Sequence, residues 1–173
     1  MKYRDIPQAI QEGSWCCNFT IRHFIERIDD WKSEGLEMNP DFQRGHVWTV
    51  GQSKRYIEAL LEGRVKNANT IYLNNSEFMN SGSRNFYCVD GLQRYNAVKL
   101  FYENKLSIYN NIKLDDFEDK HILLRMLLLK INMNTLQTRK EVLQWYLEMN
   151  SGGTVHTKEE LNRVKKLLKN EVK

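Results

Sequence analysis

The sequence predicts an α+β fold, in which helices pack on a small mixed β-sheet and the C-terminal portion of the chain is helical. Short runs of strand-forming residues occur at 15–19, 70–73, 86–89 and 128–133. Between and after these runs, apolar residues recur at helical spacing. From residue 137 onward only the helical spacing continues, and strands mixed with helices before a helical end are typical of an α+β fold.

The composition is that of an ordinary globular protein of 173 residues, with 41% hydrophobic and 28% charged residues. We expect one domain over residues 1–173, with residues 1–14 a loose lead-in and residues 137–173 a helical C-terminal extension. The net charge of +4 permits an acidic partner such as nucleic acid without requiring one. The odd number of cysteines, 3, indicates free thiols in a reducing compartment. The longest apolar run, residues 122–129, is interrupted by Arg125, so no membrane span is expected.

The first elements are a strand and a helix. Residues 15–19 predict the strand, and Thr20 is a typical N-cap for a helix whose apolar face extends to about Lys32. Residues 39–48 then form a loop that is dense in long polar and aromatic side chains.

A second helix begins at the capping box of Thr49 with Gln52 and ends at Gly63, where a glycine after the last apolar residue is expected. Residues 70–73 predict a strand, and residues 74–84 a surface loop.

The second half of the chain has weaker signals before its helical end. Residues 104–120 predict a polar connection, and residues 121–133 are ambiguous between helix and strand, with a strand favoured towards their end. A capping box of Thr138 with Glu141 opens a helix that runs through Met149.

A third capping box, Thr157 with Glu160, opens the last helix, which has one basic face. A solvated face explains these charges, and a contact with a phosphate backbone is the alternative. The basic residues are Lys158, Arg163, Lys165, Lys166 and Lys169.

The most informative stretch leads from the strand at 86–89 through Asp90 and Gly91 directly into a helix. Such a turn gathers free backbone N–H groups and the positive end of the helix dipole, which together favour a phosphate. Gln93 and Arg94 lie in the first helical turn, so we interpret the stretch as a nucleotide-phosphate site. A strand–turn–helix without any ligand is the alternative. A hairpin is disfavoured because the residues after Gly91 do not alternate.

Other chemistries lack their patterns. The histidines and cysteines show no zinc spacing, and the chain has neither a P-loop motif nor a Gly-x-Ser-x-Gly elbow. A nucleophilic Cys88 is set aside because the predicted strand would bury its thiol.

Three stretches follow one another in an order that is seen in a known family. They are residues 40–45 (PDFQRG) followed by Trp48, residues 89–94 (VDGLQR), and residues 150–154 (NSGGT) before a helix that begins near Glu159. Together they resemble the ParB-like family catalogued as domain of unknown function 262, which forms the N-terminal part of modification-dependent restriction enzymes of the GmrSD type. The resemblance covers most of the chain.

The resemblance implies a ParB/sulfiredoxin-like fold whose Asp-Gly-Gln-Gln-Arg signature binds and hydrolyses a nucleoside triphosphate. Here the signature begins at Asp90 and departs from the pattern at Leu92, which replaces the first glutamine. His46 likewise replaces the usual aromatic residue of the first stretch. Restriction-system relatives carry a C-terminal HNH-type nuclease domain, but this chain ends at Lys173, so the resemblance does not carry nuclease activity over. Short solitary relatives are common in bacteriophages, which implies a phage-encoded protein in the cytoplasm of a bacterial host.

The signature residues are assigned roles on physical grounds. Arg94 offers planar guanidinium donors to phosphate oxygens, and Gly91 lets the backbone approach closely. Asp90 either holds Mg²⁺ through one carboxylate or activates water or a hydroxyl group, and a helix-capping role is its alternative. Gln93 orients the attacking group or reads a base.

Two further loops complete the expected site. By resemblance, the loop with Gln43 and Arg44 folds over the same pocket, where Arg44 is a second phosphate clamp; a surface ion pair is its alternative. His156 is the best histidine candidate for chemistry because it lies in the third loop. A helix stop is the alternative for that loop, whose expected wall residues are Asn150, Gly152, Gly153 and Thr154.

We therefore expect an enzyme that hydrolyses or transfers phosphate from a nucleoside triphosphate with Mg²⁺, in DNA modification or in defence. The alternatives are a non-catalytic nucleotide- or DNA-binding module, a kinase acting on a modified base in DNA, and a metal-dependent nuclease that uses Asp90. The expected partners are a nucleotide and DNA, a homodimer is left open, and a membrane is not expected.

Overall fold

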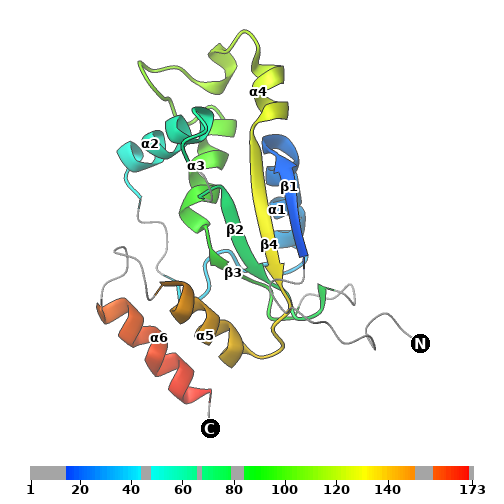
Figure 1. Ribbon diagram of the computed structural model, residues 1–173, viewed down its shortest axis with the longest axis vertical. Coiled ribbons are helices and arrows are strands. Elements are labelled where there is room, and N and C mark those ends of the chain that lie inside the picture. The colour runs from blue at the N-terminus through cyan, green and yellow to red at the C-terminus, as the bar shows by residue number, and fades with distance from the viewer. Residues whose placement is uncertain (1–14, 44–47, 66–67, 79–83, 151–157, 172–173) are drawn as a thin grey trace, which may run out of the picture.

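The computed structural model describes residues 15–43, 48–65, 68–78, 84–150 and 158–171. These residues form a four-stranded mixed sheet with packed helices, which confirms the predicted α+β fold (Figure 1). In chain order the elements are β1 (Trp15–Thr20), α1 (Ile21–Ser33), α2 (Val50–Leu61), β2 (Thr70–Asn74), β3 (Tyr87–Asp90), α3 (Leu92–Tyr102), the short 3-10 helix η3 (Leu114–Asp116), α4 (Lys120–Met126), β4 (Leu128–Asn134), α5 (Arg139–Asn150) and α6 (Lys158–Asn170).

The sheet has the strand order β1-β4-β2-β3. β4 pairs antiparallel with β1 and parallel with β2, while β2 pairs antiparallel with β3. Beyond β3, Glu37 adds a short parallel bridge: its N–H donates to Phe86 O at 2.9 Å, and Cys88 N–H donates to Glu37 O at 2.9 Å. The edge of β3 is therefore covered at this point.

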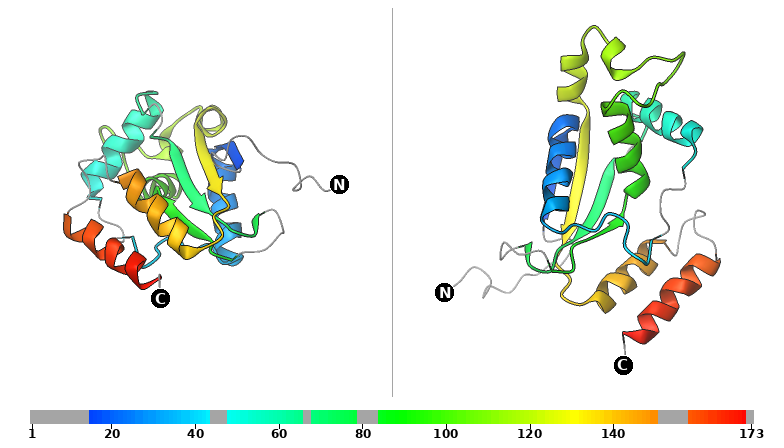
Figure 2. Two further views of the ribbon diagram at one scale, coloured as in Figure 1. Left: turned by 60° about the horizontal axis from the view of Figure 1, so that its bottom comes forward. Right: turned by 180° about the vertical axis from the view of Figure 1, so that it is seen from behind.

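The main core lies between the sheet and the helices α1 and α3, which cover the same face (Figure 2, right). β4 alternates along its length, so Leu129, Ile131 and Met133 point into this core and are fully buried. α1 contributes the fully buried Phe24, and α3 contributes the fully buried Phe101.

A second, smaller core joins β3 to the C-terminal helices. α5 and α6 lie side by side near the C-terminus (Figures 1 and 2). Its buried members are Phe42, Val89, Val142, Leu143, Tyr146 and Val164.

Most helix ends follow the local signals. The capping boxes at Thr49 with Gln52 and at Thr138 with Glu141 are confirmed by reciprocal hydrogen bonds of 2.8–3.2 Å. Thr20 occupies the N-cap position of α1, but its hydroxyl lies 3.1 Å from His23 Nδ1 and makes no capping bond. The box at Thr157 with Glu160 and the lead-in 1–14 lie outside the described residues and side chains.

The prediction of a surface loop over residues 74–84 is wrong at its start. Asn74, Asn75 and Ser76 are 0%, 4% and 7% exposed. The buried Asn74 amide donates to Asn85 O at 3.0 Å and to Leu136 O at 3.2 Å, and it accepts from Leu136 N–H at 2.8 Å. The Asn74 side chain thus forms hydrogen bonds with the backbone of two other segments. Because its own polar atoms have partners, this polar residue can be buried.

The ambiguous stretch 121–133 contains both kinds of structure. α4 ends at Met126, and the strand favoured towards the end of the stretch is confirmed as β4. All three cysteines are free, as expected. Among the described residues, no helix combines the length and apolar character needed to cross a bilayer.

The exposed basic face predicted for the last helix is confirmed at four of its residues; the side chain of Lys158 lies outside the description. The four are Arg163, Lys165, Lys166 and Lys169.

Candidate functional site

The predicted strand–turn–helix is present at the corner between β3 and α3. β3 ends at Asp90, and Gly91 is the N-cap of α3 with a φ of 112°. A Cβ atom on Gly91 would lie 2.4 Å from Ile71 Cδ1 and 3.1 Å from Ile71 Cα. Glycine is therefore required here by both the backbone angle and the close approach of β2.

Arg94 and Asp90 form an ion pair across this corner. Arg94 Nη2 donates to Asp90 Oδ2, and Arg94 Nη1 donates to the carbonyl oxygen of Thr70 on β2. The Arg94 side chain is 17% exposed and the Asp90 side chain 37% exposed. These two bonds use two of the five guanidinium N–H donors and fix the plane of the group.

The helix-capping alternative for Asp90 is not what the structure shows. The N-cap is Gly91, which has no side chain to cap the helix. The carboxylate instead orients Arg94, which lies four residues further on, in the first turn of α3.

The first-motif loop, residues 40–48, of which 40–43 and 48 are described, contacts this corner at two points. Gln43 Nε2 donates to the carbonyl oxygen of Cys88 on β3, and Trp48 N–H donates to Gln93 Oε1 on α3 at 3.1 Å. Each bond joins residues that are 45 positions apart in the sequence. Gln43 and Trp48 are thus in contact with the strand and the helix of the signature, while a pocket between the two motifs stays a prediction.

Two aromatic side chains, Trp48 and Tyr56, pack together, and the second is near enough to Arg94 to be influenced by its charge. The ring of Trp48 packs 5.3 Å from that of Tyr56, whose hydroxyl donates to Ala68 O at 3.1 Å. Burial raises the pKa of Tyr56 to about 12, against the opposing effect of the nearby Arg94 charge. Tyr56 is therefore a neutral hydrogen-bond donor at physiological pH.

The thiol of Cys88 is in an unreactive environment. Its side chain is fully buried, and burial, with the Asp90 carboxylate as the second cause, raises the pKa of the thiol to about 12. Because the thiolate is the reactive form, this position does not supply a nucleophile.

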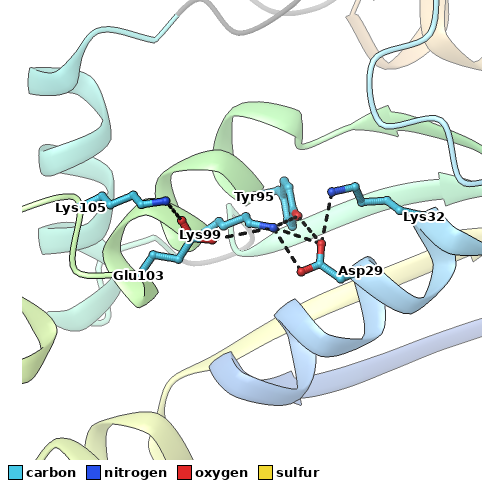
Figure 3. Close-up of polar contacts among 6 residues, drawn as sticks. All are labelled: Asp29, Lys32, Tyr95, Lys99, Glu103 and Lys105. Atoms are coloured by element: carbon cyan, nitrogen blue, oxygen red, sulfur yellow. Dashed lines mark hydrogen bonds and ion pairs between the residues drawn. The ribbon is translucent and has the colours of Figure 1, made fainter.

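A charged network holds α3 against α1 (Figure 3). Asp29 of α1 accepts from Tyr95 Oη at 3.0 Å and from Lys99 Nζ at 3.2 Å, and also from Lys32 of its own helix at 3.2 Å. Partial burial opposes ionisation of Asp29, but these donors, Lys99 first, hold the pKa of its carboxyl below the ordinary value. The network fixes the helix whose first turn carries Gln93 and Arg94.

A hollow of about 280 Å³ lies beside the network, but none of its lining residues is a predicted site residue. They are Asn96, Lys99, Leu100 and Glu103.

The remaining predicted residues are placed as follows. Asn150 is the last residue of α5, and its amide donates to Tyr146 O at 2.7 Å within its own helix. Six other residues named in the sequence analysis lie outside the described residues, namely Arg44, His46, Gly152, Gly153, Thr154 and His156.

For Mg²⁺, the described residues contain no group of three or more His, Cys, Asp or Glu side chains that would hold a metal. Asp90, with a carboxylate about one-third exposed, fits the mode in which one carboxylate, water and phosphates share the ion.

Sequence reasoning missed three partners of the site. The Asp90–Arg94 pair joins the last residue of β3 to the first turn of α3, so the spacing rule for two residues of one helix does not identify it. Arg139 and Arg163, which contact the first-motif loop at Asp41 and Gln43, lie 98 and 120 residues away from these partners, and no local signal connects them.

Comparison with known proteins gives one family. A family model described as the N-terminal domain of GmrSD restriction endonucleases matches residues 25–168. No curated protein and no solved structure matches the chain significantly.

Proposed function

The chain belongs to the family of GmrSD restriction endonuclease N-terminal domains, and from this membership we propose that it binds a nucleoside triphosphate with Mg²⁺ at the corner between β3 and α3. It hydrolyses the nucleotide or transfers its phosphate, in a process connected with the modification or restriction of DNA. The ParB-like signature Asp90 to Arg94 is the binding element.

The observation that carries this proposal is the contact between the two motifs. Gln43 donates to β3 beside the signature, and Gln93 within the signature accepts from the backbone of Trp48. These two bonds join Gln43 and Trp48 to residues on either side of the glycine turn. A glycine turn that opens a helix is a common site for a phosphate ligand, and these bonds bring the first motif next to it.

Within this site Arg94 binds the phosphates. Asp90 and Thr70 O hold two of its donors, so the guanidinium is already oriented before a ligand binds. Its other N–H groups can then bind phosphate with little further loss of side-chain entropy. The N–H groups at the start of α3 add a favourable dipole. When bound, Mg²⁺ supplies charge neutralisation of the phosphates, with Asp90 as the residue that would hold it. Gln93, the neighbour of Arg94, orients the attacking group in this proposal.

The test measures binding and turnover together. Thermal shift and phosphate release are followed with ATP, GTP, CTP or UTP plus Mg²⁺, for the wild type and for Arg94→Lys. We expect one nucleotide to raise the melting temperature of the wild type. Arg94→Lys should lose most of this shift because a lysine cannot keep the planar donor pair.

Arg27→Lys is the matched control, since Arg27 is an exposed arginine on α1 whose contacts, a long ion pair with Asp30 at 3.9 Å and a position over the Trp31 ring at 5.7 Å, lie away from the signature. It should behave as the wild type. A wild-type protein that neither retains nor turns over any of the four nucleotides would refute the proposal.

A second candidate, a DNA-binding module without turnover, is favoured by the exposed lysines of α6. Lys165, Lys166 and Lys169 are exposed on the described part of this helix. Binding of duplex DNA that weakens steeply with salt, in the absence of nucleotide turnover, would support this candidate. Labelled phosphate from the nucleotide appearing in DNA would instead identify a kinase.

A further inference from the structure

The first-motif loop is held from the C-terminal side of the protein. Arg163 of α6 donates from Nη2 to the carbonyl oxygens of Gln43 at 2.8 Å and Phe42 at 3.3 Å. Arg139 of α5 pairs with both carboxylate oxygens of Asp41, at 2.5 and 2.7 Å. Two arginines from the last two helices therefore bind three consecutive residues of the loop.

Arg139 also joins the two helices to each other. Its Nε lies 3.1 Å from the carboxylate of Glu171, which directly follows α6. The loop, α5 and the end of α6 thus share one charged connection.

An apolar seat lies beneath these contacts. Phe42 is fully buried, and its ring packs edge-on against Tyr146 of α5 at 5.3 Å and against Tyr87 of β3 at 5.8 Å. Val164, the neighbour of Arg163 on α6, is 1% exposed and belongs to the same core. The C-terminal helices therefore form much of the cavity that Phe42 fills.

The loop passes this restraint on to the signature. The carbonyl oxygen of Gln43 accepts from Arg163, and the side-chain amide of Gln43 donates to Cys88 O. Cys88 precedes Asp90 by two residues on β3. One residue of the loop thus connects α6 with the strand that ends in Asp90.

We propose that α5 and α6 form a C-terminal clasp, defined by Arg139, Arg163 and the Phe42 seat, that positions Gln43 for nucleotide binding at the β3–α3 corner. The inference rests on the proposed function. Arg163 is a positioning residue: it acts through Gln43 and touches no nucleotide. Its planar guanidinium matches two neighbouring carbonyl oxygens, a geometry that the single ammonium of lysine reproduces only in part.

The experiment compares Arg163→Ala, Arg163→Lys and Lys166→Ala in the full chain. Lys166 is the control because it is an exposed cation three residues away on the same helix. Hydrogen exchange of nucleotide-free protein is measured over residues 40–43 and β3, and dissociation constants are measured for ATP, GTP, CTP and UTP with Mg²⁺.

We expect Arg163→Ala to exchange faster in the loop and to bind the preferred nucleotide about tenfold more weakly, the equivalent of one charge-assisted hydrogen bond. Arg163→Lys should recover part of this affinity, and Lys166→Ala should match the wild type. A loss of stability alone would leave the affinity of the folded protein unchanged, so the affinity separates positioning from a merely structural role.

The outcomes distinguish the two proposals. If the wild type binds a nucleotide and Arg163→Ala binds it equally well, the clasp is refuted and the proposed function stands. Unchanged exchange of the loop in Arg163→Ala also refutes the clasp. If the wild type binds none of the four nucleotides, the proposed function fails and the clasp fails with it.

Discussion

Replacing Gly91 by alanine should destabilise the protein strongly, because two separate features of the structure exclude a side chain there. The φ of 112° lies in a region that residues with a Cβ atom rarely adopt. The new methyl group would also lie 2.4 Å from Ile71 Cδ1 and 3.1 Å from the Cα atom of Ile71. The first contact can be relieved by a side-chain movement, but the second requires β2 to shift.

The size of the effect follows from these two terms. An unfavourable backbone region costs about 1–3 kcal/mol. Overpacking in a buried position costs about 1–3 kcal/mol more. We therefore expect the free energy of unfolding to fall by about 2–6 kcal/mol, a large share of the total of about 5–15 kcal/mol that is usual for a domain.

The assay is urea unfolding followed by circular dichroism, with a partner variant that separates the two terms. Ile71→Val removes Cδ1 and costs about 0.5–1.5 kcal/mol alone. The double variant should lose about 1 kcal/mol less free energy of unfolding than the two single variants lose together, because Ile71→Val removes the atom nearest to the new methyl group.

Gly51→Ala is the matched control. Gly51 lies within α2, and a Cβ atom there would meet its nearest neighbour at an ordinary 3.6 Å. This change should stabilise the protein by about 0.5–1 kcal/mol. A Gly91→Ala protein that unfolds at the wild-type urea concentration would refute the reasoning.

Three other predictions address the network, the thiols and the loop. The pKa of the Asp29 carboxyl is lower in the folded than in the unfolded protein, so the unfolded chain is protonated there first as the pH falls. The stability that the Lys99 contact adds is therefore complete above the ordinary pKa of 3.8, and it is lost as the pH falls from there through the pKa of the folded state. Asp29→Asn should therefore reduce the free energy of unfolding at about pH 6 and much less at about pH 2, as urea titrations at both pH values will show. Cys88, whose thiol pKa is raised to about 12 by burial, should react with a disulfide reagent only after unfolding, whereas the exposed Cys16 reacts in the native protein; mass spectrometry of the labelled peptides tests both. Phe42→Ala should cost about 3–5 kcal/mol in urea unfolding because the fully buried ring leaves a cavity, and a cost below about 1 kcal/mol would contradict the burial of this ring.

Local signals predicted much of the fold because they act within a few residues. The capping box of Thr49 with Gln52, the stop at Gly63 and the change of period after Gly91 all lie inside one or two helical turns. Each is a property of a short segment, so each can be recognised without knowledge of the rest of the chain.

Features that depend on distant residues were not predictable in the same way. The parallel pairing of β2 with β4 sets Ile71 opposite Ile131, 60 positions along the chain, and nothing in either strand specifies this register alone. The burial of Asn74 likewise depends on acceptors and a donor at Asn85 and Leu136. α4 has no buried residue, so its apolar side chains lack the clear one-sided pattern that identifies a helix.

The candidate site likewise has a part that local sequence predicts and a part that depends on distant residues. The signature and its glycine were recognisable because the strand, turn and helix are contiguous. The contacts of Arg163 with Gln43 and of Arg139 with Asp41 arise only when the C-terminal helices have packed against β3.

The bridge made by Glu37 bears on how copies of this protein behave at high concentration. An uncovered strand border offers its amides and carbonyls to any extended chain, and such joining starts fibres. On the β3 side, the amide of Cys88 and the carbonyl of Phe86 are already taken by Glu37, and an incoming chain would have to displace it first. The exposed carboxylate of Glu37 adds repulsion between like molecules, so growth of aggregates is hindered on the side of the sheet that ends in the glycine corner.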